Sequence, residues 1–303
     1  MLKAATAKRK PASAINAARL GQMTAAVEVQ DLQKRYGAVR AVDGITFSVA
    51  EGEVFGLLGH NGAGKTTTIR MLTGRARPTA GRALVAGLDA VTDRDRVKPL
   101  INAVFEDPNL YDRFAGIENL RFFATLYGVK ASRADELLDL VGLREAAKRK
   151  AKTYSSGMKQ RLMIARSLIN SPRVLFMDEP TRGLDPTSAR EVRALVSQLA
   201  REGTTIFLTT HYMEEADELC TRVAFLSQGR IVALDTPREL KLRYGQRTAK
   251  VLLRDRTEHG VRLDEPQDAA KLAEWMRGDQ VLTIHSQEGT LEDVFVALAG
   301  RPL

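Results

Sequence analysis

The feature that most constrains the fold is a short apolar run that leads directly into a glycine-rich loop. The run is Val54–Leu58, and the loop reads Gly59-His60-Asn61-Gly62-Ala63-Gly64-Lys65-Thr66. Helical spacing of Thr66, Ile69 and Leu72 continues after the loop. A strand that enters such a loop and a helix that leaves it form the context in which this pattern cradles phosphate groups. The sequence therefore predicts a phosphate site within an α/β fold.

Each residue type in this loop suits an anion. The glycines let backbone N–H groups turn toward a phosphate without a Cβ clash, and the start of the following helix adds its positive dipole end. Lys65 supplies a cation to the β- and γ-phosphates, Thr66 offers a hydroxyl to Mg²⁺, and Thr67 can reach a phosphate oxygen. The residues expected to bind phosphates are Gly59, Asn61, Gly62, Ala63, Gly64, Lys65, Thr66 and Thr67.

A second apolar run ends in two acids. Val174–Met177 is typical of a buried strand, and Asp178 and Glu179 follow it directly. Ligands of open α/β sheets bind at the carboxyl ends of the strands, so these acids are expected beside the glycine-rich loop. Asp178 is placed to hold Mg²⁺ through water, and Glu179 can polarise an attacking water as general base. Together with the loop, the two acids predict a nucleoside triphosphatase site.

Strand-like runs and helical patterns alternate from Val27 onward, as in a mostly parallel sheet covered by helices on both faces. The first runs, Val27–Val29 and Ile45–Val49, look antiparallel and are expected in a separate sub-sheet. From Gly116 to about Lys152 the apolar residues fall at helical spacing, which predicts a helical insert over about residues 107–153. We place the main domain at residues 27–240 and a small α+β domain at residues 241–303.

A third motif stands just before a predicted helix and upstream of Asp178. It reads Tyr154-Ser155-Ser156-Gly157-Met158-Lys159-Gln160-Arg161. It resembles the signature of ATP-binding-cassette (ABC) proteins, usually written Leu-Ser-Gly-Gly-Gln. Tyr154, Ser156 and Met158 depart from that pattern, and the Tyr and Met forms look like those of the drug- and polysaccharide-exporting branch. The stretch Thr290–Phe295 is also similar to the end of daunorubicin-resistance-type ATPases.

The resemblance, which covers residues 27–240, implies the α/β fold of a P-loop NTPase cassette. That fold has a parallel core sheet, an antiparallel β subdomain and a helical insert, and its cofactors are ATP and Mg²⁺. Ser155, Ser156 and Gly157 would form a second anion site at a helix start. The two anion sites of one chain are far apart in the family fold. The resemblance therefore implies a head-to-tail dimer with ATP between Lys65 of one chain and Ser155 of the other.

Three further positions match motifs of the family. Tyr36 stands where the family has an aromatic ring that stacks on adenine, with a buried strand-end tyrosine as the alternative. Gly183-Leu184-Asp185 resembles the D-loop that crosses the dimer interface. His211 resembles the switch histidine that contacts the γ-phosphate. The resemblance thus implies Lys65, Glu179 and His211 as the catalytic residues.

Glu106 is a departure from the family, which normally has glutamine at this position. That glutamine touches Mg²⁺ and the attacking water, and its loop senses the membrane partner. Glu106 keeps a side-chain oxygen for the metal but adds negative charge near the γ-phosphate. The resemblance therefore implies Thr66, Asp178 and Glu106 as the residues around Mg²⁺.

The implied function is that of the ATP-binding and ATP-hydrolysing subunit of an ABC transporter, which powers export through a separate membrane permease by ATP-driven dimerisation. We expect a peripheral protein at the cytoplasmic face of the membrane, with no nucleic acid as partner. The rivals are a non-transport ABC ATPase acting on ribosomes or DNA, a regulatory module that holds ATP, and an importer subunit. One cassette without heptads, the intact acids and the form of the signature favour the exporter.

Composition adds few constraints. The chain is 44% hydrophobic and 27% charged, which is ordinary for a globular protein. No apolar run approaches the ~20 residues of a membrane-spanning helix. The one cysteine, Cys220, excludes an internal disulfide and is expected to be a small packing residue.

The formal charge of +9 is partly local to the first residues. Residues 1–26 contain no acid and carry Lys3, Lys8, Arg9, Lys10 and Arg19. We expect a disordered basic tail here, because the segment is poor in large apolar residues. A loose tail, or a true start at Met23, is favoured over a segment that touches anionic lipid or nucleic acid and over a transit peptide.

Overall fold

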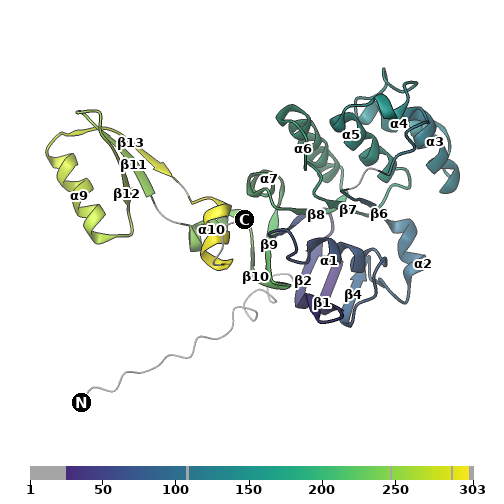
Figure 1. Cartoon of the computed structure of the whole chain (residues 1–303), viewed down its shortest axis with the longest axis horizontal. Coiled ribbons are helices and arrows are strands. Elements are labelled where there is room, and N and C mark those ends of the chain that lie inside the picture. Colours follow the sequence, from purple (N-terminus) through teal and green to yellow (C-terminus); the bar gives the residue numbers. More distant parts are fainter. Residues whose placement is uncertain (1–24, 107–108, 246–247, 288, 300–303) are drawn as a thin grey trace, which may run out of the picture.

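The computed structural model describes residues 25–106, 109–245, 248–287 and 289–299, arranged as three sheets with helices around them (Figure 1). The predicted basic tail lies outside the described residues, apart from Ala25 and Ala26. These two residues belong to the first strand, which begins earlier than predicted.

The chain alternates between strands and helices through most of its length. The strands are β1 (Ala25–Tyr36), β2 (Val39–Ala50), β3 (Val54–Leu58), β4 (Ala80–Val85), β5 (Leu88–Asp89), β6 (Ile101–Val104), β7 (Val174–Asp178), β8 (Thr205–Thr210), β9 (Arg222–Ser227), β10 (Arg230–Asp235), β11 (Thr248–Leu253), β12 (Glu258–Arg262) and β13 (Val281–Gln287). The helices are α1 (Lys65–Leu72), α2 (Arg94–Val97), α3 (Gly116–Leu126), α4 (Ser132–Leu140), α5 (Ser156–Ser167), α6 (Pro186–Arg201), α7 (Met213–Leu219), α8 (Pro237–Tyr244), α9 (Pro266–Arg277) and α10 (Leu291–Ala299), with 3₁₀ turns at Lys98–Leu100 and Ala151–Thr153.

The central sheet has the strand order β10-β9-β3-β8-β7-β6. Its strands run parallel from β9 to β6, and β10 pairs antiparallel with β9. The predicted parallel core sheet is therefore confirmed. Because β3, β7 and β8 are neighbours and parallel, the loops that follow their carboxyl ends meet at one edge of the sheet.

The antiparallel sub-sheet is also confirmed, with the order β2-β1-β4-β5. It covers one face of the central sheet through a stack of aromatic rings. The ring of Phe47 on β2 lies 5.2 Å from that of Phe55 on β3, which lies 5.6 Å from that of Phe207 on β8. These apolar contacts hold the two sheets together, because the rings are buried almost completely.

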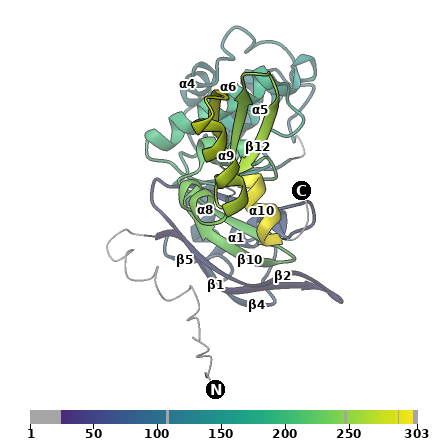
Figure 2. The same cartoon turned by 90° about the vertical axis from the view of Figure 1, so that its left-hand side faces the viewer.

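Helices cover the other face of the central sheet and form the predicted helical insert (Figure 2). Helices α3 and α4 pack against α5, and the hydroxyl of Tyr154, just before α5, donates to Ala146 O at 2.7 Å. Tyr154 stands where the signature motif usually has leucine. Its buried ring and its hydroxyl tie the start of α5 to the insert, which gives this departure a structural reason.

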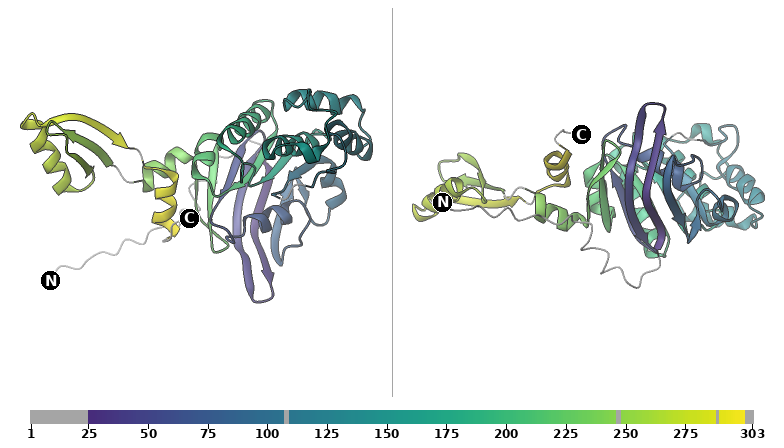
Figure 3. Two further views of the ribbon diagram at one scale, coloured as in Figure 1. Left: turned by 45° about the horizontal axis from the view of Figure 1, so that its top comes forward. Right: turned by 90° about the horizontal axis from the view of Figure 1, so that it is seen from below.

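The C-terminal residues divide differently from the prediction. The predicted boundary at residues 240/241 falls inside α8, and α10 packs on α7 and α8 with Leu291, Val294 and Phe295 in the main core. Only β11, β12, β13 and α9 form a separate small unit with its own apolar cluster (Figure 3). Helix α8 and strand β12 are not among the predicted elements.

Cys220 is buried in the main core, as predicted for a packing residue. Among the described residues, no helix combines the length and the apolar character needed to cross a membrane.

Candidate active site

A cavity of about 140 Å³ opens at the carboxyl end of β3, where the glycine-rich loop turns into α1. Most of its lining consists of predicted site residues. The lining residues are Ala41, His60, Asn61, Gly62, Gly64, Lys65, Thr66, Thr67, Glu106, Glu179 and Arg182. Ala41, His60 and Arg182 are the lining residues that the sequence did not predict. The structure therefore brings the loop, Glu106 and Glu179 together.

The backbone of the glycine-rich loop fits a phosphate group. Gly64 has φ of 113°, and a Cβ there would lie 2.3 Å from Ala41 O, so no other residue fits without a backbone shift. At the start of α1, Thr66 and Thr67 line the cavity, whereas Thr68 turns away and donates to Gly64 O. The start of α1 has no side-chain cap, and Thr66 and Thr67 line the cavity beside it, which suits an anion.

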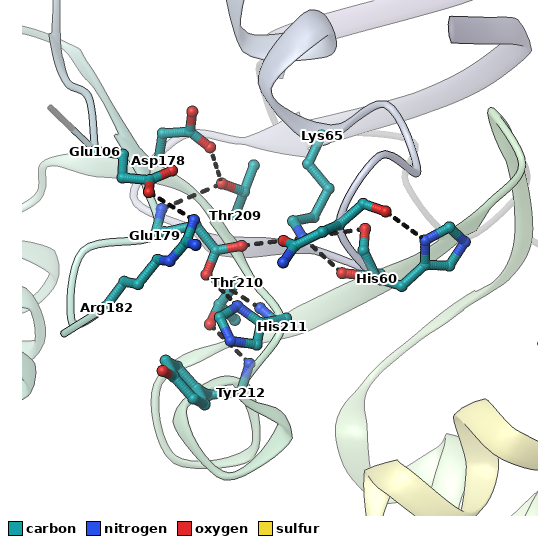
Figure 4. Close-up of polar contacts among 12 residues, drawn as sticks. His60, Lys65, Glu106, Asp178, Glu179, Arg182, Thr209, Thr210, His211 and Tyr212 are labelled. Atoms are coloured by element: carbon teal, nitrogen blue, oxygen red, sulfur yellow. Dashed lines mark hydrogen bonds and ion pairs between the residues drawn. The ribbon is translucent and has the colours of Figure 1, made fainter. Parts of the chain in front are cut away.

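Lys65 crosses the loop and ends between a carbonyl and a carboxylate (Figure 4). The residue is 5% exposed; its Nζ donates to Gly59 O at 2.5 Å and lies 3.0 Å from Glu179 Oε1. A buried ammonium is stable only with such partners. Its position next to the loop N–H groups makes it the nearest cation for the terminal phosphates of a nucleotide.

Glu179 is buried and held in an uncommon backbone conformation. Its φ is 53°, and its N–H donates to Thr209 O at 3.0 Å. Such strain persists only where the surrounding contacts enforce it, and it is concentrated at functional sites. The carboxylate Oε2 lies 2.7 Å from His211 Nδ1, so the predicted base and the predicted switch histidine are in contact.

The other carboxylate oxygen of Glu179, Oε1, has the Lys65 ammonium as its ionic partner, with Nζ at 3.0 Å. Among the residues that the structure describes, Oε1 has no further hydrogen-bond donor. A buried carboxylate oxygen beside a phosphate loop can accept a proton from water, which is the geometry required of a general base.

Asp178 lies behind Glu179 and outside the cavity lining. It is 2% exposed, and its carboxylate accepts a hydrogen bond from the Thr209 hydroxyl, whose oxygen in turn accepts from the Glu179 N–H at 3.3 Å. Thr209 on β8 therefore fixes both acids. It was not a predicted site residue, because a threonine in an apolar strand carries no distinctive pattern.

The residues around the cavity fit Mg²⁺ through oxygen donors. Thr66 and Glu106 line the cavity and Asp178 lies beside it, and hydroxyl and carboxylate oxygens are ligands that Mg²⁺ prefers. Within the described ranges, no cluster of three or more His, Cys, Asp or Glu side chains could hold a metal by itself. A magnesium ion here would therefore complete its shell with phosphate oxygens and water, as is usual for this metal.

Glu106 has an ionic partner that the sequence analysis did not identify. Its Oε1 lies 2.6 Å from Arg182 Nη1, in the loop that follows β7. Both side chains are about half exposed and both line the cavity. Two features of the sequence could have indicated the pair. Arg182 is a charged residue directly before the predicted D-loop, and Glu106 is an unusual acid in the facing loop.

Glu215 on α7 is a second buried acid near this centre. It is 1% exposed, and neither oxygen has a hydrogen-bond partner of good geometry among the described residues. Burial raises the pKa of this carboxyl, the nearby hydroxyls of Thr210 and Thr181 lower it in part, and the charge of Glu179 raises it further. Burial therefore favours the neutral form of Glu215 more than it would be favoured in an exposed glutamate.

The other predicted ligand residues lie outside the cavity lining. Tyr36 is 48% exposed at the end of β1, which excludes the alternative of a buried tyrosine, and Lys34 Nζ lies 4.9 Å from its ring centroid. Ser155 caps α5: its Oγ accepts from the Met158 N–H at 3.2 Å, which leaves its own proton for another acceptor.

Gly157 has a packing role as well as the predicted one. A Cβ on Gly157 would lie 2.2 Å from the Ser188 hydroxyl oxygen on α6, so the two helices approach closely at this point. Asp185 of the predicted D-loop caps α6, accepting from the Thr187 and Ser188 N–H groups at 3.0 Å each. The starts of α5 and α6 are thus fixed next to each other.

Comparison with known proteins places this arrangement in a family. The ABC transporter family matches residues 42–182. A fluoroquinolones export ATP-binding protein of Mycobacterium tuberculosis is 45% identical over 298 residues, covering 96% of this chain and 98% of the relative. A daunorubicin/doxorubicin resistance ATP-binding protein of Streptomyces peucetius is 39% identical and covers 93% of this chain and 94% of the relative.

Solved structures agree with the fold. A Clostridium perfringens protein that is part of an ABC transporter complex matches with a TM-score of 0.68 and 28% identity, over 72% of this chain and 91% of the other. Shared sequence across nearly the whole chain, together with the phosphate loop and the Glu179–His211 contact, leads to one assignment. The chain belongs to the ABC transporter family, as an ATP-binding and ATP-hydrolysing subunit of the drug-resistance exporter type.

Proposed function

We propose that the cavity binds Mg²⁺-ATP and that Glu179 activates the water that attacks the γ-phosphate. The contact that carries this proposal is the buried Glu179 carboxylate beside the cavity, with Oε2 held by His211 and Oε1 paired only with Lys65 among the described residues. His211 orients the carboxylate through Nδ1, and Lys65 neutralises the phosphate charge that develops. Thr66, with Asp178 and Glu106, would hold Mg²⁺, which would supply positive charge to offset that of the phosphates.

A complete ATP site in this proposal takes residues from two chains. Ser155, Ser156 and Gly157 are at the start of α5 and outside the cavity lining. The Ser155 hydroxyl proton and the N–H groups of this helix start suit a second phosphate contact. We therefore propose a head-to-tail dimer, in which Ser155 of one chain meets ATP held by Lys65 of its partner, and in which Tyr36 stacks on the adenine.

The membrane permease is the second proposed partner, and it would hold this chain at the cytoplasmic face of the membrane. The names of relatives refer to fluoroquinolones, daunorubicin and doxorubicin, and that of a Bacillus subtilis relative to linearmycin. We therefore propose an antibiotic as the class of cargo. Its binding site would belong to the permease, because the described cavity is lined for phosphates rather than for an apolar compound.

Steady-state hydrolysis of Mg²⁺-ATP by the purified full chain tests the proposed roles. Glu179→Gln should lower kcat by about 100-fold or more, the usual share of a general base, while ATP still binds. Glu214→Gln is the matched control, because Glu214 is exposed on α7 near the same loop and should keep wild-type turnover. Wild-type turnover in Glu179→Gln would remove Glu179 from the proposed mechanism.

The permease is tested by co-expression. With the membrane protein of the same transporter present, the chain should sediment with the membrane fraction, and without it the chain should stay in the supernatant. Equal distribution in both cases would contradict a permease-dependent location.

A further inference from the structure

Glu106 and Arg182 form an ion pair at the mouth of the nucleotide cavity. Glu106 follows β6 and Arg182 follows β7, so the pair joins two loops of neighbouring strands (Figure 4). Nη1 and Oε1 are 2.6 Å apart, and for the described residues this is the one ionic contact of either side chain. With this contact, the acid that replaces the usual glutamine is neutralised within the same cavity.

The partner of Arg182 can change with the nucleotide. Arg182 lines the cavity together with Lys65 and Glu179, the residues that the proposed function places at the γ-phosphate. A guanidinium prefers the planar, two-bond contact that phosphate oxygens offer, and a γ-phosphate carries more charge than one carboxylate. Because both side chains are about half exposed, the Glu106–Arg182 contact is weak enough for a phosphate to replace it.

The described neighbours of Glu106 in sequence also lie beside arginines. Phe105 packs under Arg75, whose guanidinium carbon lies 4.1 Å from the ring centroid. Asn109 O accepts a hydrogen bond at 2.6 Å from Arg166 on α5, the helix that Ser155 caps.

We propose that Arg182 senses the terminal phosphate. It pairs with Glu106 when ADP fills the cavity, and it pairs with the γ-phosphate when ATP does, which frees Glu106 and its loop. This inference rests on the proposed function, because it requires the cavity to bind nucleotide. It assigns Arg182 a direct contact with the nucleotide and makes Glu106 a competitor of the γ-phosphate for Arg182.

Calorimetric titration of the full chain with ATP and with ADP, both without Mg²⁺ so that no hydrolysis occurs, tests the inference. Arg182→Ala should weaken ATP binding about tenfold, the value of one lost charged contact, and change ADP binding less than about twofold. The ATP affinity of Arg182→Lys should fall between those of the wild type and Arg182→Ala, because lysine keeps the charge but not the two-bond geometry. Glu106→Gln should strengthen ATP binding severalfold and leave ADP binding unchanged.

The double variant separates competition from general charge effects. With Arg182→Ala already present, Glu106→Gln should lose most of its gain in ATP affinity, because the two changes act through one contact. Arg201→Ala, which removes an exposed charge at the end of α6, is the matched control and should bind both nucleotides as the wild type does. Equal losses of ATP and ADP affinity in Arg182→Ala, or a full Glu106→Gln gain in the double variant, would overturn the inference.

A failure of the proposed function would give a different result. If the wild type binds neither nucleotide, or if Lys65→Ala binds both as well as the wild type, the cavity is not the nucleotide site. If the wild type binds both and Lys65→Ala loses both, the nucleotide site stands, and the Arg182 variants alone decide whether this residue senses the γ-phosphate.

Discussion

At the scale of single residues, the site is built from side chains that fix one another. Thr209 contacts both Asp178 and Glu179, and His211 holds Oε2 of Glu179. Oε1 is left with Lys65 as its ionic partner and no hydrogen-bond donor in the described part of the chain. The arrangement explains how a buried acid can be kept ready to accept a proton in a water-poor site.

Glu215 gives a prediction on pH. Burial, partly offset by the Thr210 and Thr181 hydroxyls, raises the pKa of its carboxyl above the ordinary 4.5. The folded protein then keeps a proton that the unfolded chain releases, so the stability from this group is complete below 4.5 and is lost as pH rises toward the folded pKa. Glu215→Gln does not titrate, so its free energy of unfolding should fall less than that of the wild type as the pH rises above about 4.5.

Urea unfolding at several pH values measures this difference. Glu214→Gln changes the exposed neighbour, and its free energy of unfolding should depend on pH as that of the wild type does. If the free energies of unfolding of the wild type and Glu215→Gln change with pH in parallel, Glu215 has the same pKa in the folded and unfolded states, which contradicts the prediction.

At the scale of elements, the packing of α5 on α6 explains a glycine of the signature motif. Gly157→Ala places a Cβ against Ser188, and we expect a loss of about 1–3 kcal/mol in the free energy of unfolding from this overlap. Ser188→Gly removes the opposing side chain. The double variant should therefore lose about 1 kcal/mol less in its free energy of unfolding than the two single variants lose together. Denaturant unfolding of all three variants measures this coupling. Additive effects would show that the two helices have room to separate.

Helix α10 gives a second test at this scale, because it belongs to the main core rather than to the small C-terminal unit. Phe295 is fully buried, 5.5 Å from the ring of Phe225. Phe295→Ala should cost about 3–5 kcal/mol of stability in the main thermal transition. Val296→Ala changes the exposed neighbour on the same helix and should stay within about 0.5 kcal/mol. If Phe295→Ala lowered the stability of only a separate thermal transition of the small unit, the packing of α10 in the main core would be contradicted.

The sequence predicted those elements whose patterns are local. The strand before Gly59, the strand before Asp178 and the helix after Gly64 all have their predicted bounds to within a residue or two. Strand β12 and helix α8 were missed because their apolar residues are few, and α10 was assigned to the wrong unit because its long-range packing leaves no local signal. Arg182 was missed for the same reason, since its partner is distant in the sequence.

At the scale of the whole molecule, one chain brings together only part of the proposed ATP site. The cavity collects Lys65, Thr66 and Glu179, whereas Ser155 lies at the start of α5 and outside the lining. If ATP is bound by both sets of residues, two chains must meet around it. ATP would then favour the closed pair, and hydrolysis would reopen it, which is a population shift that a permease can follow.

The proposed dimer is tested most directly by the molecular mass of Glu179→Gln, measured by light scattering with and without Mg-free ATP. We expect a shift from monomer to dimer on addition of ATP and no shift with ADP. Ser156→Arg, added to the same variant, places a bulky side chain on the exposed first turn of α5 and should abolish the shift while ATP still binds. A chain that binds ATP and stays monomeric throughout would contradict the proposed pair of identical cassettes.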